Sequence, residues 1–229
     1  MTSETSTVGI LMLETTFPRI PGDIGNPASF PFPVRYQTVK GASPQKVVID
    51  ADAGLVDGFI DAGRRLVAKD VKAITTSCGF LALFHRQLVE ALPVPVFTSS
   101  LLQVHLARAL IRCDQTVGII TASKPALTDA HLAGVGIQDY PLAIAGMETS
   151  EEFSAVFLGG KERLDEAKCR REMEAAACDL MSAHRGIGAI VLECTNMPPY
   201  ADSIRRATGV PVFDAVTLVH HARLSVGAY

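Results

Sequence analysis

Two of the five cysteines, Cys78 and Cys194, occur in the same local setting. Each follows an apolar run typical of a buried strand, at 73–76 and 189–192, and each precedes a helical pattern. A thiolate can remove a proton from a carbon, and a second thiol can return one to the opposite face. The pair therefore predicts cofactor-independent acid–base chemistry at a carbon centre, in preference to two packed hydrophobes or a disulfide. The cysteines expected to pack as ordinary small side chains are Cys113, Cys169 and Cys178.

The same two cysteines fall at one offset in an internal repeat. Residues 71–107 align without a gap against residues 187–223, with 10 identities in 37 positions. The alignment pairs the two cysteines, two histidines (His105 and His221) and two copies of the sequence VPVF. Such self-similarity indicates a duplicated structural unit. The two thiols are therefore expected at equivalent ends of two similar lobes, facing one another across a cleft.

Apolar β-branched runs alternate with helical patterns along most of the chain. Strands are predicted at 8–13, 47–49, 73–76, 94–97, 117–121, 189–192 and 210–213. Helices are predicted at 56–68, 81–91, 101–112, 162–183 and 200–207. Strands rich in Val and Ile that are separated by helices are typical of parallel sheets covered on both faces. The predicted fold class is α/β, with two similar lobes, each a parallel sheet flanked by helices, related by pseudo-twofold symmetry.

The repeat also predicts where the chain divides. Residues 1–98 together with 216–229 are expected to form the first lobe, and residues 99–215 the second. The active site is expected in the cleft between them.

Both cysteines are predicted at the point where a strand ends and a helix begins. Parallel sheets bind ligands at the carboxyl ends of their strands, where helix N-termini offer free N–H groups. Such groups favour a thiolate and also bind a carboxylate. The candidate substrate-binding residues flank the thiols or follow the strand at 117–121: Ser77, Gly79, Phe80, Thr121, Ser123, Thr195 and Asn196. Capping and turn formation are the alternative interpretation of these residues. Glu193 either tunes the adjacent thiol or forms a turn.

These features resemble the aspartate/glutamate/hydantoin racemase superfamily. The resemblance rests on the opening VGIL, a cysteine after TTS, the mid-chain strand VGIIT and a second cysteine in ECTN. It implies one active site between two lobes, in which Cys78 and Cys194 act without pyridoxal phosphate or metal. Gly79 and Phe80 after the first cysteine, and Asn196 after the second, depart from the patterns of the amino-acid racemases. These departures point away from aspartate or glutamate as the substrate.

The predicted activity is that of a racemase acting on an amino acid or a derivative. One thiol removes a proton alpha to a carboxylate or carbonyl, and the other returns it. A cis–trans isomerase with one nucleophilic thiol and a decarboxylase of the same superfamily are the alternatives, together with a non-catalytic relative that binds a small molecule. The expected partner is a small carboxylate-bearing substrate, and a homodimer or a higher homo-oligomer is left open.

The segment 14–42 contains several prolines and no helical period, which predicts a long loop. Its aromatic residues argue against disorder, so we expect it to pack over the end of the first strand and line the cleft. Asn26 is a further candidate to contact substrate. Arg19 and Arg35 are each interpreted either as a bidentate partner for a carboxylate or as a structural arginine.

Composition limits the class of protein. The formal net charge of −3 gives no electrostatic reason to expect nucleic acid or a membrane as a partner. The chain has no apolar run of the length of a membrane span, and its first residues do not resemble a secretory leader. No CxxC or paired-histidine spacing indicates a metal site. A cytoplasmic location is therefore expected.

Overall fold

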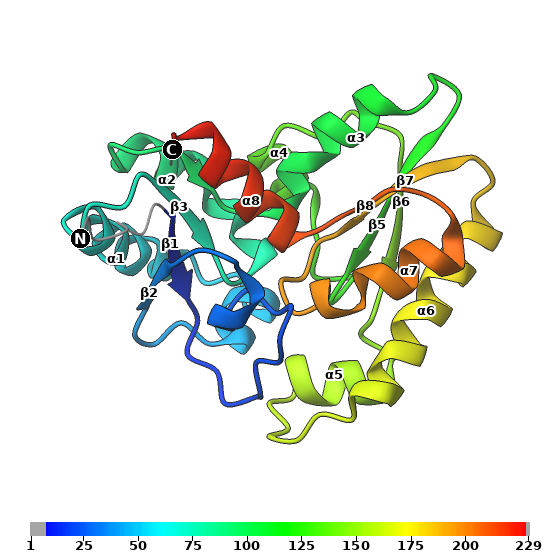
Figure 1. Cartoon of the computed structure of the whole chain (residues 1–229), viewed down its shortest axis with the longest axis horizontal. Helices are drawn as coiled ribbons and strands as arrows, with labels where there is room; N and C mark the ends of the chain where they lie inside the picture. Colours follow the sequence, from blue (N-terminus) through cyan, green and yellow to red (C-terminus); the bar gives the residue numbers. More distant parts are fainter. Residues whose placement is uncertain (1–7, 228–229) are drawn as a thin grey trace.

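The computed structural model describes residues 8–227, which form two four-stranded sheets lying side by side (Figure 1). All the strand pairs within both sheets are parallel, and helices flank each sheet. This confirms the predicted two-lobed α/β class. The first residues, which are not expected to form a secretory leader, and the last two residues predicted for the first lobe lie at 1–7 and 228–229. Both stretches are outside the described residues.

The two sheets have the same strand order. The first contains β1 (Val8–Met12), β2 (Val34–Thr38), β3 (Ala73–Thr76) and β4 (Val96–Phe97), in the order β2-β1-β3-β4. The second contains β5 (Thr116–Thr121), β6 (Leu142–Gly146), β7 (Ile187–Leu192) and β8 (Val212–Phe213), in the order β6-β5-β7-β8. The two cysteines therefore follow corresponding strands, β3 and β7, each of which lies inside its sheet.

Eight α-helices are described along residues 8–227. They are α1 (Val56–Val67), α2 (His85–Ala91), α3 (Val104–Leu110), α4 (Asp129–Gly134), α5 (Glu151–Phe157), α6 (Glu166–Ala183), α7 (Ala201–Thr208) and α8 (Ala215–Ser225). Short 3-10 helices precede several of them, including Gly79–Phe84 directly after Cys78 and Pro198–Tyr200 soon after Cys194. Within this described part, no helix has the length and apolar character needed to cross a membrane.

Strand β1 is covered on both faces because its side chains alternate. Val8 and Ile10 pack with Ala215 and Val219 of α8, which returns across the first sheet after the second lobe is complete (Figure 1). On the opposite face, a side chain at Gly9 would lie 2.8 Å from Leu66 of α1, so the glycine allows this helix to approach the strand closely. The sheet is thus held between a helix from early in the chain and one from its end.

The strand predicted at 47–49 is wrong. These residues lie in a π-helix, Gln45–Ile49, in which Val47 and Val48 are buried. A three-residue apolar run does not distinguish a strand from one buried face of a helical turn. The structure also contains elements that were not predicted: β2 inside the segment 14–42, the edge strand β6, and helices α4, α5 and α8. The lobe boundaries at 98/99 and 215/216 stay a prediction, since no comparison tests them.

Candidate active site

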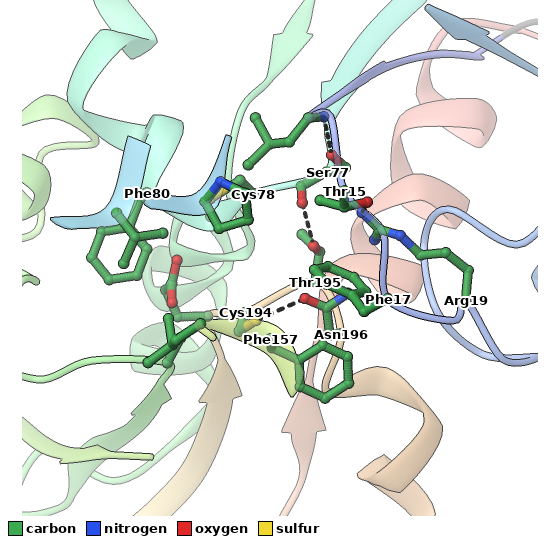
Figure 2. A pocket seen from close by; sticks show the side chains of 17 residues that line it. Thr15, Phe17, Arg19, Ser77, Cys78, Phe80, Phe157, Cys194, Thr195 and Asn196 are labelled. Carbon is green, nitrogen blue, oxygen red and sulfur yellow. Dashed lines mark hydrogen bonds between the residues drawn. The ribbon is translucent and has the colours of Figure 1, made fainter. Parts of the chain in front are cut away.

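Both cysteines line one small cavity between the two sheets (Figure 2). Most of its walls come from the residues beyond the carboxyl ends of β1, β3, β5 and β7, as expected for a parallel sheet, and the rest from the π-helix Gln45–Ile49 and the end of α5. The lining residues are Leu13, Thr15, Phe17, Arg19, Pro44, Val48, Ser77, Cys78, Gly79, Phe80, Ala122, Phe157, Leu158, Glu193, Cys194, Thr195 and Asn196. The cavity measures about 20 Å³, which holds about one water molecule. The site is therefore closed, and any organic substrate needs it to open.

Cys78 is almost completely buried, with 8% of its surface exposed. It immediately precedes the 3-10 helix Gly79–Phe84. Burial, and then the nearby carboxylate of Glu193, raise the pKa of its thiol to about 12. The backbone N–H groups of Phe80 and Leu81 act in the opposite direction and favour the thiolate, although the Leu81 N–H itself donates to the carbonyl oxygen of Cys78 at 3.2 Å. Nearby backbone N–H groups thus favour the Cys78 thiolate, whereas burial in the cavity disfavours it.

Cys194 is held differently, through a chain of hydrogen bonds. Its thiol donates to Oδ1 of Asn196 at 3.4 Å (Figure 2). Nδ2 of Asn196 in turn donates to Oδ2 of Asp23 at 2.6 Å. Burial and then Glu193 raise the pKa of Cys194 well above its ordinary value. The Asn196 side chain accepts the thiol proton, whereas the Asn196 backbone N–H lowers the pKa of the thiol. The two thiols therefore differ in their surroundings although they follow equivalent strands.

Glu193 places a carboxyl group beside both thiols. The residue is fully buried, and its Oε2 accepts a hydrogen bond from Thr121 Oγ1 at 2.8 Å. Its Oε1 is buried without a partner among the described residues. Burial raises the pKa of this carboxyl to about 7, against the lowering effects of Thr121 and the Ala122 N–H. A Cβ added at Gly79 would lie 2.1 Å from Oε1, so only glycine allows this approach.

Arg19 brings positive charge from the segment 14–42 to the cavity wall. Its Nη1 donates to Asp23 at 2.9 Å and its Nη2 donates to Thr15 Oγ1 at 3.1 Å. The guanidinium also lies over the ring of Phe17, 4.7 Å from the ring centre. Its Nε is buried with no hydrogen-bond partner in residues 8–227. The arginine is therefore held in place with one donor unused.

The two lobes meet across the cavity by polar and aromatic contacts. Thr195 Oγ1 donates to the backbone carbonyl of Ser77 at 2.6 Å, which joins the residues beside the two thiols (Figure 2). Phe17 packs edge-on against Phe157 of α5 at 5.1 Å between ring centres. These contacts close the site on two sides.

The structure gathers most of the predicted site residues and leaves some outside. Ser77, Gly79, Phe80, Thr195 and Asn196 line the cavity with the two cysteines. Three predicted residues do not line the cavity. Thr121 donates a hydrogen bond to Glu193, and Ser123, two residues further along the chain, is buried. Asn26 caps the 3-10 helix Pro27–Ser29. Arg35 is exposed on β2.

Sequence reasoning missed Asp23, Thr15 and Phe157. Asp23 is 2% exposed and connects Arg19 to Asn196, yet nothing in its sequence neighbourhood distinguishes it from a turn residue. Phe157 belongs to α5, which was not predicted. Within the described residues, no three His, Cys, Asp or Glu side chains are grouped so as to hold a metal ion.

Comparison with known proteins places this geometry in a family. The family model "Asp/Glu/Hydantoin racemase" matches residues 42–222. A dimethylsulfoniopropionate lyase of Durusdinium sp. clade D is 31% identical over 223 residues, covering 92% of this chain and 72% of that protein. Dimethylsulfoniopropionate lyase 6 of Emiliania huxleyi (strain CCMP1516) is also 31% identical, over 92% of this chain, but the chain spans only 57% of its length.

Solved structures show the same fold at low identity. A variant of arylmalonate decarboxylase in its sulfate-associated form superposes with a TM-score of 0.66 at 15% identity, covering 97% of this chain and 94% of that one. Glutamate and aspartate racemases share the fold at 17% and 14% identity. With the family model matching most of its length, the chain belongs to the Asp/Glu/hydantoin racemase family.

Proposed function

We propose that this protein is a lyase that removes a proton alpha to a carboxylate and expels a leaving group from the β carbon. Dimethylsulfoniopropionate is the substrate to test first, because it is named in relatives that are 31% identical over most of this chain. The observation that carries the proposal is the shared cavity, which combines two thiols with the half-buried Arg19.

The proposed reaction needs one base. A cysteine thiolate takes the α proton, the C–H electrons form the carbon–carbon double bond, and the bond from the β carbon to sulfur breaks. The sulfonium keeps that electron pair and leaves as neutral dimethyl sulfide, and the other product is acrylate. The proton on the thiol then passes to water, so the cysteine returns to its starting state.

Charge at the cavity wall fits such a substrate. The guanidinium of Arg19, which lines the cavity, can bind a carboxylate, and its positive charge stabilises the electron density that accumulates there as the α proton leaves. The aromatic rings of Phe17, Phe80 and Phe157 line the same cavity. Aromatic faces attract cations such as a sulfonium, which supports binding of the leaving group at that side.

The presence of a second thiol favours a second candidate, a racemase or epimerase. Cys78 and Cys194 come from different lobes and line the same cavity, which is the arrangement that removal and return of a proton on opposite faces requires. A racemase needs both thiols for each turnover, whereas an elimination needs only one base. The two reactions therefore differ in what the loss of one cysteine does.

The test is release of dimethyl sulfide into the headspace from dimethylsulfoniopropionate, measured for the wild type, Cys78→Ser and Cys194→Ser. The substitution of the base is expected to lower kcat by at least about a hundredfold, because general-base catalysis contributes factors of that order. Cys169→Ser, at a buried cysteine of α6 that does not line the cavity, is the matched control and is expected to keep its activity.

Two results would contradict the lyase proposal. One is the absence of dimethyl sulfide with correctly folded wild-type protein. The other is full activity in both single variants. Exchange of the α proton of chiral carboxylates with deuterated solvent, lost in both cysteine variants, would instead support the racemase.

A further inference from the structure

Glu193 is a buried acid that has no role in the elimination proposed above. Its Oε2 is held by Thr121, while its Oε1 has no partner among the described residues and lies against Gly79, the residue after Cys78. The carboxyl lines the same cavity as both thiols. A buried carboxyl oxygen without a partner is costly, so its retention beside a reactive thiol points to a use there.

We propose that Glu193 accepts the proton of the Cys78 thiol, so that the thiolate forms together with a neutral carboxylic acid. This inference rests on the proposed function and assigns the step that converts the Cys78 thiol into the thiolate base. The thiol S–H bond breaks, its proton passes to the Glu193 carboxylate, and the sulfur keeps the electron pair. The net charge of the cavity is one negative charge before and after the transfer.

Conservation of charge is the physical reason for this step. The pKa of the Cys78 thiol is raised to about 12, so release of its proton to bulk water leaves very little thiolate at neutral pH. Transfer to an adjacent carboxylate adds no net charge to a buried site and avoids that penalty. The carboxyl pKa of about 7 means that a large fraction of Glu193 is ionised and able to accept at neutral pH.

The geometry favours Cys78 over Cys194 as the donor. The Cys194 thiol donates to Asn196 Oδ1, whereas no hydrogen bond from the Cys78 thiol is found among the described residues, so its proton is free to move. Backbone N–H groups favour the thiolate at both sulfurs, those of Phe80 and Leu81 at Cys78 and that of Asn196 at Cys194. Oε1 of Glu193 also approaches the chain at Gly79, directly beside Cys78.

Other charged or titratable groups lie around Cys78 and Glu193. They are Cys194 in the same loop, Arg19 and Asp23 of the segment 14–42, and His131 of α4, whose ring packs on Phe80 at 5.2 Å. Burial lowers the pKa of His131 below its ordinary value, so this imidazole is neutral at pH 7 and above. A change of thiol reactivity near pH 7 is therefore assigned to Glu193.

The experiment measures alkylation of each cysteine by iodoacetamide between pH 5.5 and 10, resolved by peptide mass spectrometry. In the wild type, the Cys78 rate is expected to rise through about pH 7 and then level off, as Glu193 ionises. In Glu193→Gln this rise is lost, the rate at pH 7.5 falls at least about tenfold, and reactivity appears only at alkaline pH. The glutamine oxygen can still accept from Thr121, which preserves the local packing.

Two further variants separate proton transfer from a structural role. Glu193→Asp keeps a carboxyl and is expected to restore the rise near neutral pH. Thr121→Val removes a bond that lowers the pKa of Glu193, so it is expected to move the rise to higher pH. The exposed cysteines Cys113 and Cys178 serve as internal controls, and their profiles should be the same in all variants.

The opposite sign would overturn the inference. If Glu193 only repels the thiolate, Glu193→Gln lowers the thiol pKa and speeds alkylation at pH 7.5. An unchanged Cys78 profile, or a change confined to Cys194, also overturns it. Because alkylation needs no substrate, failure of the lyase proposal shows as absent dimethyl sulfide, and failure of this inference shows as an unaltered pH profile.

Discussion

Glu193 also links the pH to the stability of the fold. Its pKa is raised by burial from 4.5 to about 7, so the folded protein holds this proton more tightly than the unfolded chain. The resulting stabilisation is fully present below pH 4.5 and is lost as the pH rises through 7. We expect the unfolding free energy of the wild type to fall by up to about 3 kcal/mol more than that of Glu193→Gln between pH 4.5 and 8. Urea denaturation at both pH values measures the difference, and parallel curves for the two proteins would contradict it.

Gly79 is expected to tolerate no side chain. A Cβ there would lie 2.1 Å from Oε1 and 2.3 Å from the backbone carbonyl oxygen of Glu193, which belongs to the other lobe. Gly79→Ala must separate these contacts and is expected to cost about 1–3 kcal/mol, as overpacked cores do. Gly58→Ala in α1 is the matched control, because its nearest neighbour would lie 3.4 Å away and alanine favours a helix. Chemical denaturation that found Gly79→Ala as stable as Gly58→Ala would refute the close approach.

At the scale of elements, the segment 14–42 supplies the positive charge at the cavity wall, through Arg19. Arg19 is fixed by Asp23 and Thr15 and reaches the cavity, whereas Arg35 on β2 is exposed. Arg19→Lys removes the planar fork and the Nε donor, so KM is expected to rise about 10- to 100-fold, in line with a lost charged hydrogen bond. Arg35→Lys in the same segment should leave KM unchanged. Steady-state kinetics on the substrate found by the headspace assay check both, and an unaltered KM in Arg19→Lys would exclude it as the carboxylate partner.

The sequence allowed the repeated strands to be predicted, because β3 and β7 lie inside their sheets and are buried along almost their whole length. It did not reveal β2 and β6, in which nearly all positions are half-exposed or exposed, or the helical state of 47–49. Cys78 and Cys194 were found through the repeat. The roles of Asp23 and Arg19 at the site depend on hydrogen bonds between segments far apart in the chain, and a local pattern carries no information on such pairings.

For the whole molecule, we expect contacts between the two lobes to limit access to the thiols. The edge-on contact between Phe17 and Phe157 joins the segment 14–42 to α5 above a cavity too small for a substrate. Phe157→Leu removes an aromatic pair of about 0.5–1.5 kcal/mol, which corresponds to an increase of up to about tenfold in the open population. We expect alkylation of Cys78 and Cys194 to accelerate by that factor. Phe153→Leu, which contacts Phe157 but does not line the cavity, controls for general loosening, and equal acceleration in both variants would contradict the gating role.

The return of α8 to the first sheet has a consequence for synthesis on the ribosome. Val8 and Ile10 are covered in part by Ala215 and Val219 of α8, which emerge from the ribosome more than two hundred residues later. The second sheet is complete before α8 is made, so it can fold while one face of β1 is still uncovered. Exposed apolar strands of this kind aggregate or recruit chaperones. The nascent chain can therefore hold a complete second sheet while the first sheet still lacks α8 on one face of β1.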